Sequence, residues 1–297
     1  MTAARDTSTP SGGQRLEGAP DPDLMIEASG SVRVAADVFG DEGPLVLLQH
    51  GGGQTRHAWK GAGQELARAG YRAVSLDARG HGDSDWAPDG DYSTESMIAD
   101  LAAVIDHFGQ EPVLVGASMG GGISLTGVGE GAISARALVL VDTAPRVEPD
   151  GIQKIRDFMS QAPDGFAALE DVAEAIANYQ PHRTRPRKLD GLAKNVRLWP
   201  DGRYRWHWDP AFILRPRELA DRIPRQEAAA ANLTLPALLV RGGLSDVLSE
   251  DGARAFLELV PQSRYANVGQ AAHMVAGDRN DIFVAAVLDF LSDVVPA

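Results

Sequence analysis

The chain has 297 residues, 44% of them hydrophobic, so it can bury a large core. Its net charge of −13 would repel nucleic acids and anionic membranes, which argues against both as partners. It contains no cysteine, which excludes disulfides, thiolate metal sites and a cysteine nucleophile; we expect a reducing compartment, the cytoplasm.

The first predicted elements form one edge of a sheet. Residues 1–22 are rich in Thr, Ser, Gly and Pro and lack the apolar segment of a signal peptide, so we expect a disordered N-terminal tail. Strand-like runs follow at residues 24–27 and 32–38, on either side of a turn at Gly30 and Ser31. This pattern predicts two antiparallel strands.

A strand-helix-strand rhythm then begins. Apolar runs at residues 45–49 and 71–76 enclose a helical segment at 64–69, which indicates a parallel sheet covered on both faces. Ser93 is placed to cap the next helix, whose apolar residues recur at helical spacing until Gly109 ends it. We expect residues 23–145 to form the first part of an α/β core.

One serine in this core stands out. The segment Gly116-Ala-Ser-Met-Gly120 follows an apolar strand and precedes a helix, which is the setting of a nucleophile elbow with G-x-S-x-G spacing. A serine in that strained turn brings the residues two before and two after it close together, so only very small residues fit there. The following helix would direct positive backbone N–H groups towards Ser118, where an oxyanion could be stabilised.

The rhythm stops over residues 146–231. This region has helical stretches, no strand-like apolar run and a dense aromatic cluster, so we expect a helical cap inserted into the core. Trp206 and Trp208 in that cluster could form the cap's own core or the apolar wall of a substrate pocket. We interpret the basic run at residues 182–188 as solvated surface.

The core resumes over residues 232–297. Strands are predicted at residues 235–240 and 263–268, and helices at 251–259 and at the C-terminal end.

Chemically useful residues follow five of the predicted strands, where open parallel sheets bind their ligands. They are His50 with three glycines, the segment 77–84, the Ser118 turn, the segment 241–246 ending in Asp246, and the segment 269–273 ending in His273. The chain order is serine, acid, histidine.

On these five motifs the sequence resembles the α/β-hydrolase fold family from about residue 24 to 294. The resemblance implies an α/β fold with a mostly parallel eight-stranded sheet flanked by helices and an inserted cap. It implies that Ser118 is the nucleophile, His273 the general base and Asp246 the acid that orients the imidazole. Asp142 also ends a strand, and because some relatives place the acid there it is the alternative.

The resemblance also implies an oxyanion hole and a reaction. Its donors would be the N–H groups of Met119 and Gly52, with Gly53 as the alternative to Gly52. A serine at position 118 argues against epoxide hydrolases and haloalkane dehalogenases, which use an aspartate. We expect a serine hydrolase that cleaves a carboxylic ester or lactone of a small, largely apolar substrate through an acyl-enzyme.

Three other activities of the fold are compatible with the same motif. They are hydrolysis of a carbon-carbon bond in vinylogous diketones, cofactor-free perhydrolysis, and a small-molecule receptor. We expect no cofactor and no metal, since His81 with Asp83 and Asp85 on one turn is a weak ligand set. Homo-oligomerisation is compatible with the sequence.

Overall fold

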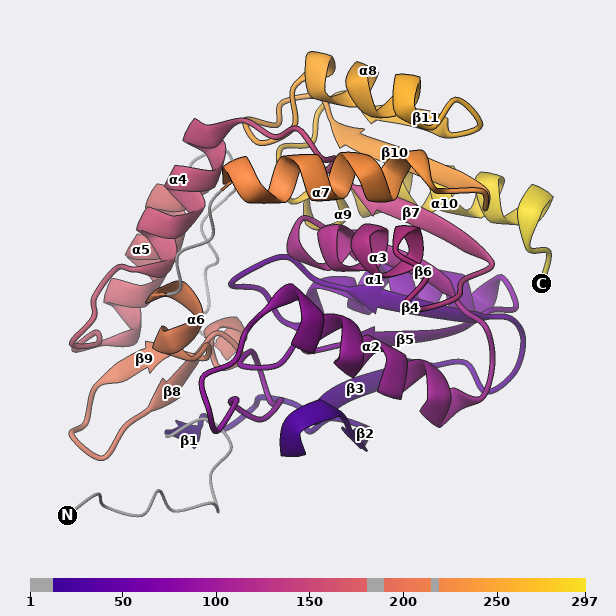
Figure 1. Cartoon of the computed structure of the whole chain (residues 1–297). Coiled ribbons are helices and arrows are strands. Elements are labelled where there is room, and N and C mark those ends of the chain that lie inside the picture. Colours follow the sequence, from indigo (N-terminus) through magenta and orange to yellow (C-terminus); the bar gives the residue numbers. More distant parts are fainter. Residues whose placement is uncertain (1–12, 181–189, 215–218) are drawn as a thin grey trace.

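A single eight-stranded sheet organises the computed structural model, which describes residues 13–180, 190–214 and 219–297 (Figure 1). In spatial order the strands are β11 (Arg264–Val268), β10 (Ala237–Gly242), β7 (Ala137–Val141), β6 (Val113–Ala117), β4 (Leu45–Gln49), β5 (Arg72–Leu76), β3 (Arg33–Phe39) and β2 (Leu24–Glu27). Strand β3 runs antiparallel to β5 and β2, and the other pairs are parallel. The predicted fold class is confirmed.

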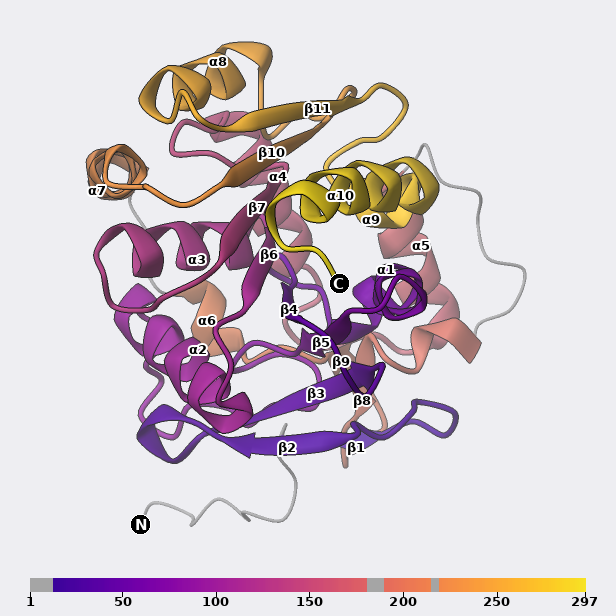
Figure 2. The ribbon, with the colours of Figure 1, turned by 90° about the vertical axis from the view of Figure 1, so that its right-hand side faces the viewer.

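Side chains that alternate between the two faces of the sheet divide the core into two layers. In β4, Leu45 and Leu47 belong to one buried cluster, while Val46 and Leu48 belong to the other. The first layer is covered by α2 (Thr94–Phe108), α3 (Met119–Gly129) and α8 (Glu250–Leu259), and the second by α1 (Lys60–Arg68) and α10 (Asn280–Val294). Figure 2 shows α2 and α3 on one side of the sheet and α1 and α10 on the other.

Local capping explains the boundaries of α2. Ser93 is extended and its hydroxyl accepts a hydrogen bond from the Ser96 N–H, which satisfies one of the free donors at the helix start. Gly109 ends the helix at φ 60°, a conformation that glycine adopts without strain. Both signals were read correctly from the sequence.

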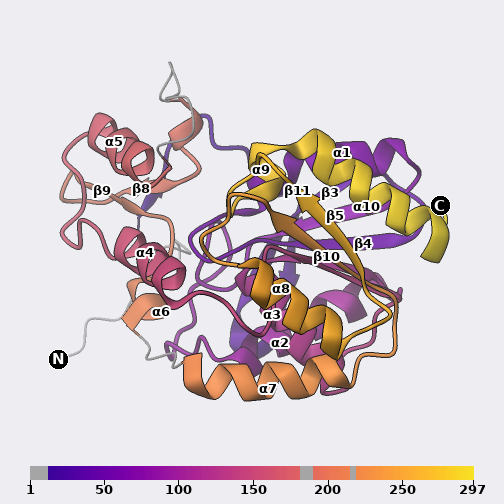
Figure 3. The ribbon, with the colours of Figure 1, turned by 90° about the horizontal axis from the view of Figure 1, so that it is seen from above.

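The cap is a lobe beyond the carboxyl ends of the parallel strands (Figures 1 and 3). It contains α4 (Pro149–Met159), α5 (Leu169–Tyr179), the short strands β8 (Val196–Leu198) and β9 (Tyr204–Trp206), and α6 (Pro210–Leu214). The expectation of a helical cap at residues 146–231 therefore missed the two short strands. Strands of three residues are too short to give a periodic apolar signal, and they pair within a sheet of their own.

The end of the predicted cap also needs correction. Helix α7 (Leu219–Ala231) packs along α3 at the side of the sheet, as Figure 3 shows. Its contact is close, because a Cβ added to Gly129 would lie 2.2 Å from the Ala229 carbonyl oxygen. The helix belongs to the core layer, although the cap precedes it in the chain.

The tail prediction fails for its second half. Residues 1–12 lie outside the described part of the chain, but β1 (Gln14–Arg15) pairs antiparallel with β8 of the cap. Main-chain hydrogen bonds to a partner distant in sequence leave no compositional trace, so this pairing was invisible in a Thr- and Gly-rich segment. The ordered chain begins before residue 23.

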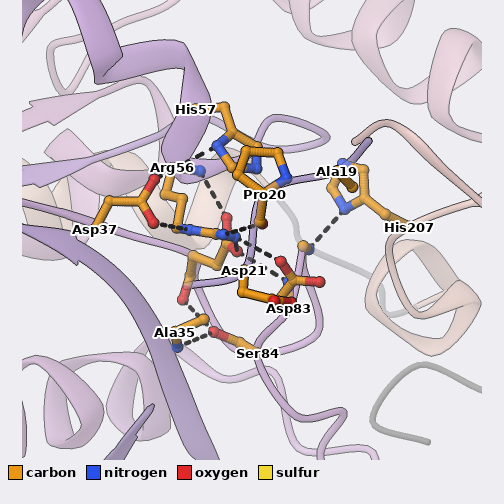
Figure 4. Close-up of polar contacts among 12 residues, drawn as sticks. Ala19, Pro20, Asp21, Ala35, Asp37, Arg56, His57, Asp83, Ser84 and His207 are labelled. Carbon is orange, nitrogen blue, oxygen red and sulfur yellow. Dashed lines mark hydrogen bonds and ion pairs between the residues drawn. The ribbon is translucent and has the colours of Figure 1, made fainter. Parts of the chain in front are cut away.

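A buried arginine links tail, core and cap (Figure 4). The Arg56 side chain is fully buried and donates to Asp37 at 2.6 Å, to Asp77 at 2.7 Å and to Asp83 at 2.8 Å. It also donates to the Pro20 carbonyl at 3.1 Å. These contacts fix the loop that follows β5, because Asp77 and Asp83 of this loop share one planar donor group with Asp37 of β3.

From the cap, Arg197 donates to Asp83 at 2.8 Å. His207 accepts a hydrogen bond from the Gly82 N–H at 2.7 Å (Figure 4). In the described part of the chain no helix is long and apolar enough to cross a membrane.

Candidate active site

Ser118 occupies a strained turn between β6 and α3. Its φ of 47° and ψ of −109° are unfavourable for a residue with a side chain. A Cβ added to Gly116 would lie 2.4 Å from the Gly121 nitrogen, and one added to Gly120 would lie 2.6 Å from the Gln49 Cβ. The glycines of the G-x-S-x-G segment are therefore required by close backbone packing, as the sequence predicted.

The carboxylate that contacts the histidine is Asp142, at the end of β7. The His273 Nδ1 donates to the Asp142 Oδ2 at 2.7 Å. Asp142 is fully buried, and its other oxygen accepts from the Gly242 N–H at 2.8 Å. The Ser245 hydroxyl donates to Oδ2 as well. This carboxylate is thus held by three donors in a protein interior, with its φ at 50°.

The assignment of Asp246 as the partner of the imidazole was wrong. Its side chain is about half exposed and binds Lys154 of α4 at 2.7 Å. Both aspartates follow a strand in the same sheet, so chain order could not separate them. The turn after β10 separates them. In this turn the Ser245 hydroxyl donates a hydrogen bond to Asp142, whereas the Asp246 carboxylate makes no such contact and binds Lys154.

Two buried histidines hold the loops beside Ser118. His50 donates through Nδ1 to the Gly51 carbonyl and accepts at Nε2 from the Ala78 N–H, at 2.7 and 3.0 Å. His81 accepts at Nε2 from the Gly53 N–H at 3.2 Å. Burial lowers the pKa of His50, which keeps its ring neutral and able to accept. Both residues therefore brace loops.

The backbone hydrogen bonds of this loop distinguish Gly52 from Gly53 as the second oxyanion donor beside Met119. The Gly53 N–H already donates to His81 Nε2 at 3.2 Å. The N–H groups of Gly52 and Met119 have no acceptor among the described residues, and both residues line a cavity together with Ser118. The geometry favours Gly52 over Gly53.

Ser118 lies between two cavities. The larger has a volume of about 340 Å³ and also contains His273, Trp206 and Trp208 in its wall. The smaller has a volume of about 170 Å³ and lies against α4 and α7. Gly52, Ser118 and Ile155 line both, so the two halves of a bound molecule could extend in different directions from the serine.

The wall of the larger cavity is aromatic. Trp206 and Trp208 stack with ring centroids 4.9 Å apart, and Phe158 of α4 packs 5.1 Å from Trp206. Phe158 also stacks on Tyr179 of α5 at 4.2 Å. Burial and the negative charge of Asp246 raise the pKa of Tyr179 to about 12, so its phenol stays protonated. The two tryptophans thus serve as cavity wall and cap core together.

Sequence reasoning missed the cations of this site. Lys194 lines the larger cavity, and Arg156 and Arg222 line the smaller one. Burial lowers the pKa of Lys194, and no carboxylate of the described residues pairs with it. No motif marks these positions, because only the folding of the cap brings them towards Ser118. Within residues 13–180, 190–214 and 219–297, no group of three His, Asp or Glu side chains is arranged to hold a metal ion.

Comparison with protein families decides the broader assignment. The family model described as "alpha/beta hydrolase fold" matches residues 44–279. The chain belongs to the α/β-hydrolase fold family. The match covers every element that positions Ser118, Asp142 and His273, so the resemblance seen in the sequence is confirmed.

Several relatives of this α/β-hydrolase have names. The chain is 29% identical over 275 residues to the esterase Rv0045c of Mycobacterium tuberculosis, covering 88% of this chain and 86% of that protein. It is 28% identical over 215 residues to the probable protein phosphatase methylesterase 1 of Caenorhabditis elegans. That match covers 68% of this chain but only 59% of the relative.

Among solved structures, E-2-(acetamidomethylene)succinate hydrolase superposes with a TM-score of 0.77 at 22% identity. The superposition covers 90% of this chain and 98% of that one, and it shows that the fold is shared.

Proposed function

We propose that this protein is a carboxylic ester hydrolase that works through an acyl-enzyme on Ser118. The observation that carries the proposal is the hydrogen bond to the buried Asp142 from His273, which lines the same cavity as Ser118. A serine hydroxyl attacks at neutral pH only when a neighbouring imidazole takes its proton. An imidazole does so efficiently when a carboxylate fixes its tautomer and stabilises its charged form.

Each step of the reaction has a candidate group. Ser118 would attack the ester carbonyl while Nε2 of His273 takes the hydroxyl proton, and Asp142 would stabilise the imidazolium that results. The same proton then passes to the leaving alcohol. Water, activated by His273, would hydrolyse the acyl-enzyme and regenerate the serine.

The tetrahedral intermediate would be stabilised by backbone donors. The N–H groups of Met119 and Gly52 are the candidates, and each such donor commonly contributes ~10²-fold or more in rate. Met119 begins α3, so the positive end of the helix adds to the stabilisation of an oxyanion. The strained Ser118 backbone supports this role, because it holds the hydroxyl and the following N–H in a fixed relation.

The cavities support a small ester or lactone. Their volumes of about 340 and 170 Å³ suit two short substituents on either side of a carbonyl. The names of the relatives, an esterase and a methylesterase, agree with ester hydrolysis. Trp206 and Trp208 would provide the apolar contact for the larger substituent.

A fluorophosphonate probe tests the nucleophile directly. It should label the wild-type protein and should not label Ser118→Ala, with equal thermal melting of the two proteins as the folding control. Hydrolysis of p-nitrophenyl acetate should show an initial burst and then many turnovers. Equal labelling of both proteins, or a single turnover followed by arrest, would contradict the proposed function.

A further inference from the structure

The smaller cavity beside Ser118 contains an arginine that the proposed mechanism does not use. Arg222 lies on α7 and lines this cavity together with Gln226, one helical turn later. The Nε and Nη2 atoms of Arg222 are buried, and neither has a hydrogen-bond partner among the described residues. A buried guanidinium without acceptors is costly, so its retention at this position calls for an explanation.

The electrostatic surroundings of Arg222 make its charge less favourable still. Burial lowers its pKa first, and the positive charge of nearby Arg156 lowers it further. Arg156 lines the same cavity. An anion bound at Arg222 would offset both the burial of its guanidinium and the effect of the Arg156 charge on it.

The two free nitrogens are the pair that binds a carboxylate side-on. Four other arginines in the described part of the chain use Nε and Nη2 together on the two oxygens of one carboxylate. The pairs are Arg33 with Asp85 at 2.9 and 3.1 Å, Arg79 with Asp100 at 2.5 and 2.6 Å, Arg225 with Glu130 at 2.6 and 2.9 Å, and Arg279 with Asp281 at 3.1 and 3.0 Å. Arg222 presents the same pair of donors, and no carboxylate in the part of the chain that the structure describes receives them.

Resting on the proposed ester hydrolysis, we propose that Arg222 recognises a carboxylate on the substrate. The substrate class is then a monoester of a short dicarboxylic acid, or a lactone bearing a carboxylate. The free carboxylate enters the smaller cavity between α4 and α7, and the ester group lies at Ser118. A cavity of about 170 Å³ limits the spacer between the two groups to a few carbon atoms.

This assignment changes the expectation of a largely apolar substrate. The apolar part belongs in the larger cavity, against Trp206 and Trp208, and the charged part in the smaller one. Arg222 acts as a specificity residue, and the reacting atoms are handled by Ser118, His273 and Asp142.

The test compares esters that differ only in charge. Monomethyl esters of succinate, glutarate and adipate are matched with their uncharged monoamides, and kcat/KM is followed by acid release. For the best chain length we expect the wild-type enzyme to prefer the carboxylate at least ~10-fold, because a charged hydrogen bond replaces a neutral one. Arg222→Met should lose roughly 10- to 100-fold with the anionic ester and little with the amide.

Two controls separate recognition from structure. Arg225→Met alters a neighbour on the same helix that pairs with Glu95 and Glu130 outside the cavity, and it should keep the preference. Arg222→Met should melt at the wild-type temperature or higher, since it removes an unpaired buried charge. A lower melting temperature with equal loss for both esters would mark a structural role and overturn the proposal.

Binding without turnover separates this proposal from the proposed function. By calorimetry, Ser118→Ala should bind monomethyl glutarate more tightly than its monoamide, and the added Arg222→Met change should remove the difference. Selective binding without hydrolysis by the wild type would reject the esterase function and support the carboxylate site. Hydrolysis by the wild type without a preference for the charged ester would support the esterase function and reject the carboxylate site. A preference that survives Arg222→Met and disappears in Lys194→Met would place the anion in the larger cavity and overturn the assignment.

Discussion

Replacing Asp142 with asparagine should remove most of the turnover while leaving a folded protein. The side chain is fully buried, and Oδ2 receives donors from both His273 and Ser245 while Oδ1 receives the Gly242 N–H. An asparagine has one acceptor oxygen and one NH₂ group. Whichever way the amide is turned, its NH₂ faces at least one donor.

The surrounding contacts leave little room for adjustment. The Ser245 hydroxyl oxygen already accepts from the N–H groups of Val247 and Leu248 at 3.1 and 3.2 Å, so its proton has only the carboxylate to bind. If NH₂ replaces Oδ2, the His273 ring must present an unprotonated Nδ1, which leaves Nε2 protonated and unable to take the serine proton. If NH₂ replaces Oδ1, it meets the Gly242 N–H.

The expected loss of kcat follows from the loss of the correct His273 tautomer. Loss of the correct tautomer in a serine-histidine-aspartate site lowers kcat by about 10⁴-fold, which is about 5.5 kcal/mol of activation free energy. The unpaired buried donor should also lower the free energy of unfolding by about 1–3 kcal/mol. The expected loss of activity is therefore far larger than the loss of stability.

The assay is kcat for p-nitrophenyl butyrate, with urea unfolding as the measure of stability. Asp246→Asn is the matched control, because this carboxylate is exposed and binds only the exposed Lys154 among the described contacts. It should keep near wild-type turnover. A large loss in Asp246→Asn together with an active Asp142→Asn would refute the reasoning and return the role to Asp246.

Three further predictions concern the supports of the site. Gly120→Ala should cost about 1–3 kcal/mol of stability, because its Cβ would lie 2.6 Å from the Gln49 Cβ, whereas Gly191→Ala, with open space around it, should be neutral in the same melting experiment. Arg56→Met should lower the free energy of unfolding by about 3–5 kcal/mol in urea titrations, since it leaves buried carboxylates unpaired. A loss below about 1 kcal/mol, which is the contribution of an exposed ion pair, would mean that water replaces the arginine. Burial places the pKa of His207 well below 6.5, so on acidification the unfolded chain binds the proton before the folded protein does. The free energy of unfolding should therefore keep its full value above pH 6.5 and fall below it, by up to about 1.4 kcal/mol per pH unit. A His207→Asn variant whose free energy of unfolding depends on pH as in the wild type would contradict this.

The sequence by itself determined the elements whose signals are local. The Ser93 cap, the Gly109 stop and the alternating apolar strands follow from contacts between near neighbours, so the mostly parallel sheet and its order of loops could be predicted. The Ser118 turn was predictable for the same reason, because its close packing lies within a few residues and with β4 alongside.

Only the tertiary structure decided which carboxylate meets the imidazole and what lines the cavities. Asp142 and Asp246 end adjacent strands with similar local patterns, and the choice depends on a turn that directs one carboxylate inwards and leaves the other with Lys154. The pairing of β1 with the cap and the burial of Arg222 beside Ser118 likewise depend on segments distant in sequence. Such contacts are set by the packing of whole elements, which no local pattern of residues encodes.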